Sequence, residues 1–163
     1  MVKNIMKDYN YFIIARVLHV LGIVIWIGGV AFVTTILIPS LRKLADADKR
    51  LELFETLEGR FAFQAKIVTL ITGLSGLYMI YYLDVWSRYL ALSFWWMHLM
   101  TFVWFVFTVV LFIFEPLFLH QWFHKQALKN SERAFFFLHT LHKILLTLSL
   151  IAIFGAVAGV RGF

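Results

Sequence analysis

The sequence predicts an all-α fold, an integral membrane four-helix bundle, on the basis of two observations. First, 62% of the 163 residues are hydrophobic and 15% are charged, whereas soluble domains contain about 45–50% apolar and about 25% charged residues. Second, apolar stretches at 12–38, 61–83, 92–119 and 134–160 each exceed the roughly 20 residues that cross a bilayer as a helix. A water-soluble globule is thereby excluded, and residues 1–163 form a single domain.

Four spans place the N-terminus, the 84–91 connection and the C-terminus on one face of the membrane, called side A. Connections 39–60 and 120–133 lie on the other face, called side B, where most of the 15 Lys and Arg residues gather. The positive-inside bias then predicts that side B is cytoplasmic and that both termini are outside. We expect a multi-pass protein of a bacterial or archaeal inner membrane. The amphipathic segment 41–57 is expected to form an interfacial helix.

Composition also limits the partners and the cofactors. The net charge of +6 does not indicate nucleic acid, because the basic residues flank membrane spans, where the lipid bilayer and topology explain them. The chain has no cysteine. Disulfides, iron–sulfur clusters and covalently attached haem are therefore excluded, and His, Met and carboxylates are left as metal ligands.

Two histidines lie inside different spans at nearly the same predicted depth. His19 is seven residues from the side-A start of the first span, and His98 is six residues into the third span. At 1.5 Å per residue both lie about 10 Å deep. Ionisable side chains inside a membrane are costly and usually functional, so this pair is the main candidate site.

Glycines of the other helices reach the same layer and leave room for a flat group. We therefore predict one haem b with His19 and His98 as axial ligands of the iron, contacted by Gly22 and Gly76. Arg16, three residues before His19, is placed to meet a propionate. Helix packing and plain hydrogen bonding are the structural alternatives, and nearby methionines allow His/Met ligation or a copper(I) site. The further members of the layer are Gly73, Gly155, Gly159, Met79, Met97 and Met100, with Arg88 and Arg161 as more exposed propionate partners.

A second polar layer lies near side B. It contains His139 and His142 in the fourth span, and His120 and His124 after the third. These four are less favoured metal ligands, and a second haem there is not favoured, because His98 and His120 are about 33 Å apart along one helix. Proton relay, quinone binding and metal ligation remain open for the layer, and Gln64 lies at similar depth. A salt bridge of Glu115 with Lys66 or Lys143 would equally explain the charges.

The first span contains a motif that begins at Leu18-His19 and continues through Gly22, Trp26 and Gly28-Gly29, and Pro39-Ser-Leu-Arg42 follows it. This motif resembles the first helix of the copper-resistance D (CopD-like) domain family. Gly59-Arg60-Phe61, leading into Leu70-Ile-Thr72-Gly73-Leu74, resembles that family's second helix. The HemJ-type protoporphyrinogen oxidases are similar in their first helix and in the third, where Trp96-Met97-His98 matches and Met100 replaces a lysine. The resemblance implies a four-helix haem-binding bundle and points to His19 and His98.

These observations together predict a cytochrome b-like membrane protein in electron transfer with a quinone or a membrane redox partner protein. The alternatives are CopD-like copper binding or transport, HemJ-like protoporphyrinogen oxidation, and a structural subunit. A homo-oligomer could form through the face that carries Gly155 and Gly159.

Overall fold

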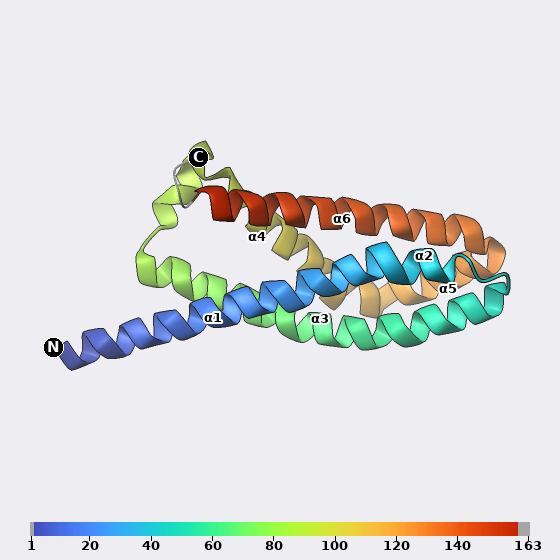
Figure 1. The fold of residues 1–163 in the computed structure, drawn as a ribbon, viewed down its shortest axis with the longest axis horizontal. Helices are drawn as coiled ribbons and strands as arrows, with labels where there is room; N and C mark the ends of the chain where they lie inside the picture. Colours follow the sequence, from blue (N-terminus) through green and yellow to red (C-terminus); the bar gives the residue numbers. More distant parts are fainter. Residues whose placement is uncertain (1, 160–163) are drawn as a thin grey trace.

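The structure, a computed structural model, describes the backbone of residues 2–159 and the side chains of residues 8–117 and 121–159. Every regular element in this range is a helix. Four helical segments are long and apolar enough to cross a membrane: Asp8–Leu41, Ala47–Leu83, Leu92–Leu117 and Ser131–Gly159. The prediction of an all-α multi-pass membrane bundle is therefore confirmed, and Figure 1 shows the segments running back and forth along one long axis.

The first and third spans each contain a wider, π-helical turn beside a proline. α1 (Val2–Phe32) continues through η1 (Val33–Leu37) into α2 (Ile38–Leu41), which holds Pro39 in its first turn. α4 (Trp95–Val109) continues through η4 (Val110–Leu119), which contains Pro116, into α5 (His120–Lys129). Proline lacks a backbone N–H, and a π-helical turn changes the hydrogen-bonding pattern around it. In both spans the helical backbone therefore continues past the proline.

α3 (Ala47–Leu83) differs from the prediction at its start. Residues 41–57 do not form a separate interfacial helix, because residues 47–57 are the first turns of the second span. The Asp46 side chain accepts from the backbone N–H groups of Asp48 (3.0 Å) and Lys49 (3.1 Å), which caps the helix at this point. No proline follows before Leu83, so nothing separates these turns from the apolar stretch.

The side-A connection between α3 and α4 is also ordered. α3 ends at Asp84, whose backbone adopts a left-handed conformation with φ 50°. Two short 3₁₀-helices follow, η2 (Trp86–Leu90) and η3 (Leu92–Phe94). At side B, α6 (Ser131–Gly159) begins where the Asn130 side chain accepts from the Arg133 N–H at 2.9 Å.

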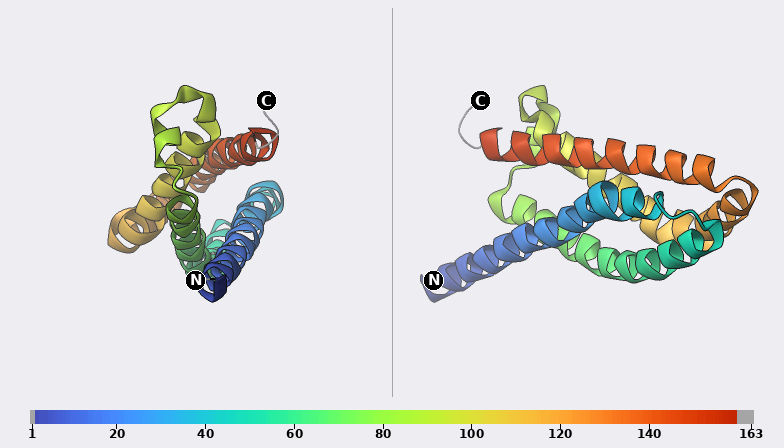
Figure 2. Two further views of the ribbon diagram at one scale, coloured as in Figure 1. Left: turned by 90° about the vertical axis from the view of Figure 1, so that its left-hand side faces the viewer. Right: turned by 45° about the vertical axis from the view of Figure 1, so that its right-hand side comes forward.

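The helices associate as two pairs, α1 with α3 and α4 with α6. Near side B and in the middle of the bundle, the pairs close around a buried apolar core. Towards side A the ribbons of the two pairs diverge, as the right-hand view of Figure 2 shows. The core residues are Val33, Leu37, Ile38, Leu41, Leu51, Phe54, Phe123, Ala127, Ala134 and Phe135 near side B, and Trp26, Ile27, Val30, Val68, Val103, Phe107 and Leu146 in the middle.

Candidate functional site

His19 lies in the contact between α1 and α3. Its Nδ1 is 2.8 Å from the carbonyl oxygen of Thr72 and 3.4 Å from Ser75 Oγ. A carbonyl oxygen can only accept, so the proton is on Nδ1, and in the neutral ring Nε2 carries the lone pair. This is the arrangement in which a metal-bound histidine donates its other ring N–H to a backbone carbonyl, which fixes the ring's orientation.

Gly22 and Gly76 both allow α1 and α3 to approach closely at this level. A Cβ atom on Gly76 would lie 2.9 Å from Cε1 of His19, and one on Gly22 would overlap the Thr72 hydroxyl. At both positions the added Cβ atom would lie closer to its neighbour than real Cβ atoms do. The two glycines proposed as cofactor contacts therefore accommodate the His19 ring and the Thr72 side chain in this structure.

The other glycines of the predicted layer face tryptophan rings. A Cβ atom on Gly73 would meet Trp104, and one on Gly155 or Gly159 would meet Trp95 or Trp96. Gly155 and Gly159 thus lie in the contact between α6 and α4. Much of the space that the glycines leave is occupied by indole rings.

His98 attaches the side-A connection to α4. Its Nδ1 is 3.1 Å from the carbonyl oxygen of Phe94, its Nε2 is 3.0 Å from that of Tyr89, and its ring meets the Tyr89 ring edge to face. The buried residues of α4 are Trp96, Met97, Val103 and Phe107. With about 100° per residue, His98 lies on the face opposite Trp96 and Phe107.

The two histidines lie at similar depth, as the sequence predicts. Trp104 donates to the Thr69 carbonyl at 2.9 Å, which sets the register of α4 against α3. His98, six residues before Trp104, then lies within about one helical turn of the level of His19. Their contacts, however, involve different elements, α3 for His19 and η2 for His98, and the structure does not bring the two rings together.

Two helix faces that are buried in the middle of the bundle are exposed where they continue towards side A. On α1, Ile27 is buried, while Val20 and Arg16, seven and eleven residues earlier on the same face, are exposed. On α6, Leu146 is buried while Leu150 and Val157 of that face are exposed. Along α1 the packed core thus ends between Ile27 and Val20, close to His19 in the sequence. Towards side A the ribbons of the two helix pairs diverge (Figure 2).

Two of the candidate propionate partners, Arg16 and Arg88, are at the side-A end. Arg16 lies over the Phe12 ring, with 5.9 Å between Cζ and the ring centroid, and Arg88 lies over Phe94 at 5.1 Å. Arg161 is outside the described residues. Of the methionines, Met97 is buried in α4, and Met79 and Met100 are half-buried.

The polar residues near side B have separate partners. Lys66 on α3 pairs with Glu115 on η4 at 2.6 Å, which confirms one of the two salt bridges considered for Glu115. His139 Nε2 donates to the Thr34 carbonyl on η1 at 2.9 Å, and His142 Nδ1 is 3.0 Å from Leu138 O of its own helix. Gln64 is exposed.

Of the two histidines after the third span, His124 does not add to this group. His124 Nδ1 is 2.7 Å from Glu55 Oε1, and the side chain of His120 is outside the described residues. Within the part of the chain that the structure describes, no three His, Asp or Glu side chains form a group that could hold a metal ion.

An apolar cleft of about 460 Å³ lies on the outer surface of α3, beside the side-A connection. It is lined by Leu74, Leu77, Tyr78, Tyr81 and Trp86. Sequence reasoning gave no signal for this cleft, because its α3 residues also form an ordinary lipid-facing stripe.

Comparison with protein-family models, with curated proteins and with solved structures finds no match for this chain. The donor set can still be tested against a haem. His19 has the chemistry of a residue that would hold the iron, because its tautomer leaves Nε2 as the donor. His98 does not fit as it stands, because both of its ring nitrogens lie at backbone carbonyls and the ring is turned away from the core.

Proposed function

We propose that this chain is a membrane-embedded b-type haem protein that acts in electron transfer, with His19 as a ligand of the haem iron. The observation that carries the proposal is the hydrogen bond from His19 Nδ1 to the Thr72 carbonyl. It places a proton on Nδ1, so Nε2 of the neutral ring is the atom left to bind a metal, inside a membrane, where an unused ionisable side chain is costly.

A haem suits the surroundings of His19 better than a bare ion does. The porphyrin supplies four of the iron ligands, so one or two side chains are enough to hold it. Val20, next to His19 on α1, is exposed and apolar, and so are Leu150 and Val157 on the side-A half of α6, as the surroundings of a macrocycle should be. Arg16, closer to side A, supplies a positive charge at the end where propionates would meet water.

The role of His98 in this proposal is limited by its contacts. As a second axial ligand it would have to give up its contact with the Tyr89 carbonyl and turn towards α1. We therefore assign His19 as the ligand and assign His98 to holding η2 against α4. Met97, buried on the neighbouring face of α4, and His98 after reorientation are the candidates for a second side chain that would hold the haem.

The haem, when bound, supplies one-electron transfer, and the residues of this chain hold it and exclude water. Its apolar surroundings and the retained backbone hydrogen bond of His19 would tune the reduction potential. The electron partner in this proposal is a membrane quinone or a membrane redox protein, because both reach a site within the bilayer.

The first test is the haem content of protein purified from haem-replete cells. We expect an oxidised Soret band, a reduced spectrum of the b type and one haem per chain. We also expect a quinol in the same detergent to reduce the haem. Colourless protein would contradict haem binding, and copper bound in equal amount without a Soret band would favour the copper alternative.

A further inference from the structure

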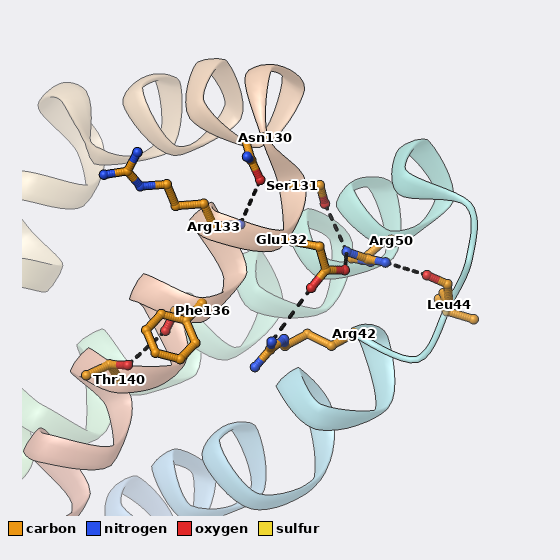
Figure 3. A network of polar contacts seen from close by, with 9 residues as sticks. All are labelled: Arg42, Leu44, Arg50, Asn130, Ser131, Glu132, Arg133, Phe136 and Thr140. Carbon is orange, nitrogen blue, oxygen red and sulfur yellow. Dashed lines mark hydrogen bonds and ion pairs between the residues drawn. The ribbon is translucent and has the colours of Figure 1, made fainter.

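A cluster of charged residues at side B is independent of the haem proposal. It lies where the end of α2, the first turns of α3 and the start of α6 meet (Figure 3). Its centre is Arg50, which is only 5% exposed. Arg50 Nη1 donates to Glu132 Oε1 (2.5 Å) and Ser131 Oγ (3.2 Å), and Nη2 donates to the Leu44 carbonyl (2.5 Å). Glu132 is therefore engaged by Arg50.

Arg42, the second arginine of the cluster, has a positive charge that no hydrogen-bonded carboxylate neutralises. Its Nη2 is 3.6 Å from Glu132 Oε2, which is longer than a hydrogen bond. Its Nε is buried without a hydrogen-bond partner, so the Nη groups are the donors that a ligand can reach, on a side chain that is 32% exposed. One carboxylate thus serves two guanidinium groups, and the cluster keeps a net positive charge.

The position of Arg42 is at the boundary of the membrane. It directly follows the first span, as the C-cap residue of α2. Its guanidinium lies 5.8 Å from the centroid of the Phe136 ring, which is 61% exposed on the outer surface of α6. A cation with unused donors therefore sits beside an exposed aromatic ring at the depth of lipid headgroups.

We propose that Arg42, with the Phe136 ring beside it, binds the phosphate of an anionic phospholipid. A guanidinium matches phosphate oxygens with two parallel hydrogen bonds, and Arg42 has donors that Glu132 does not fill. The Phe136 ring offers apolar surface to the adjoining acyl chain. Basic sites between membrane helices are typical places for acidic headgroups. Free inorganic phosphate carries the same chemistry, so the experiment must separate the two sources.

The test uses the purified full chain in a neutral detergent and follows its thermal unfolding midpoint. Phosphatidylglycerol, phosphatidylcholine and inorganic phosphate are added separately. We expect phosphatidylglycerol to raise the midpoint by several degrees at saturation, and phosphatidylcholine and inorganic phosphate to leave it unchanged. Arg42→Gln should remove most of the rise. Arg133→Gln is the matched control, because Arg133 is exposed at the same end of α6 and points away from Arg42 in Figure 3, and it should keep the rise.

Arg42→Lys is the second variant, because it keeps the charge and loses the bidentate geometry. We expect it to fold and to show a clearly reduced rise, and native mass spectra should show fewer retained phosphatidylglycerol molecules for both Arg42 variants. An equal rise with phosphatidylcholine, a rise with inorganic phosphate alone, or a full rise in Arg42→Gln would each overturn the proposal.

Discussion

The side-B half and the side-A half of the bundle are built from the same four spans but are held together differently. Near side B, buried aromatic and aliphatic side chains from the first, second and fourth spans and from α5 pack together, and Arg50 ties the start of α3 to the start of α6. Near side A, His19 holds α1 to α3, and tryptophans against Gly155 and Gly159 hold α4 to α6. The two pairs are joined there by Trp104 of α4, which lies against Gly73 and donates to the Thr69 carbonyl of α3. The comparison indicates that the side-B core supplies stability, while the less densely packed side-A half is where we propose that the haem binds.

The largest expected effect comes from removing a buried ring at side B. Phe135 is 0% exposed, and Phe135→Ala should destabilise the protein by about 3–5 kcal/mol through the cavity that remains. Phe154→Ala is the matched control, since Phe154 is on the same helix near side A and is 72% exposed. Thermal or denaturant unfolding in detergent measures both. Equal losses in the two variants would contradict the difference between the halves.

Loss of the Arg50 contacts is the next largest effect. Arg50→Ala removes the hydrogen bonds to Ser131, Glu132 and Leu44 and leaves a partly exposed carboxylate behind. We expect a cost of about 2–3 kcal/mol, less than for a fully buried pair, because Glu132 is well solvated. The same unfolding measurement on Arg133→Ala should give a change within about 0.5 kcal/mol. If Arg50→Ala is equally mild, the side-B cluster is not a stabilising contact.

The Lys66–Glu115 pair tests whether charges inside the spans are structural. Lys66→Met or Glu115→Gln alone should cost about 1–3 kcal/mol, because each leaves one charge without its partner in a half-buried site. The double variant should cost less than the sum of the single variants. A double-mutant cycle on unfolding free energies measures the coupling, and additive losses would show that the two side chains do not interact.

The smallest effect concerns the contact that holds His19. Gly76→Ala would place a Cβ atom 2.9 Å from the His19 ring, so we expect a loss of about 1 kcal/mol and a changed imidazole resonance in the NMR spectrum. Gly28→Ala is the control, because no atom lies within 4 Å of a Cβ there and alanine favours the helix. An unshifted His19 resonance in Gly76→Ala would contradict the position of the ring.

The fold was largely predictable from the sequence, because hydropathy and length alone determine which segments cross a bilayer. Three of the four spans, and the end of the second, appear close to their expected limits. The start of α3 was not predicted, because a change from polar to apolar composition suggested two helices where the backbone has none of the breaks that would separate them. The capping side chain of Asp46 was the signal that a single helix begins there.

The depth of the two candidate histidines in the membrane could be predicted from the sequence, but the direction of the His98 side chain could not. Counting residues from the membrane boundary gave similar depths for His19 and His98 because both helices start on side A. The direction of His98 depends on how the 3₁₀ turns η2 and η3 fold back onto α4, and composition carries little information about that. A helical wheel centred on Trp96, Val103 and Phe107 would have placed His98 on the opposite face.

The most direct test of the central claim compares two histidine variants by their visible spectra. We predict that His19→Ala loses the Soret band or binds haem only weakly, while His98→Ala retains a b-type spectrum and loses stability at the side-A connection. Both proteins should be purified in parallel with the wild type and their haem quantified per chain. Full haem binding in His19→Ala, with loss of haem in His98→Ala, would contradict the account.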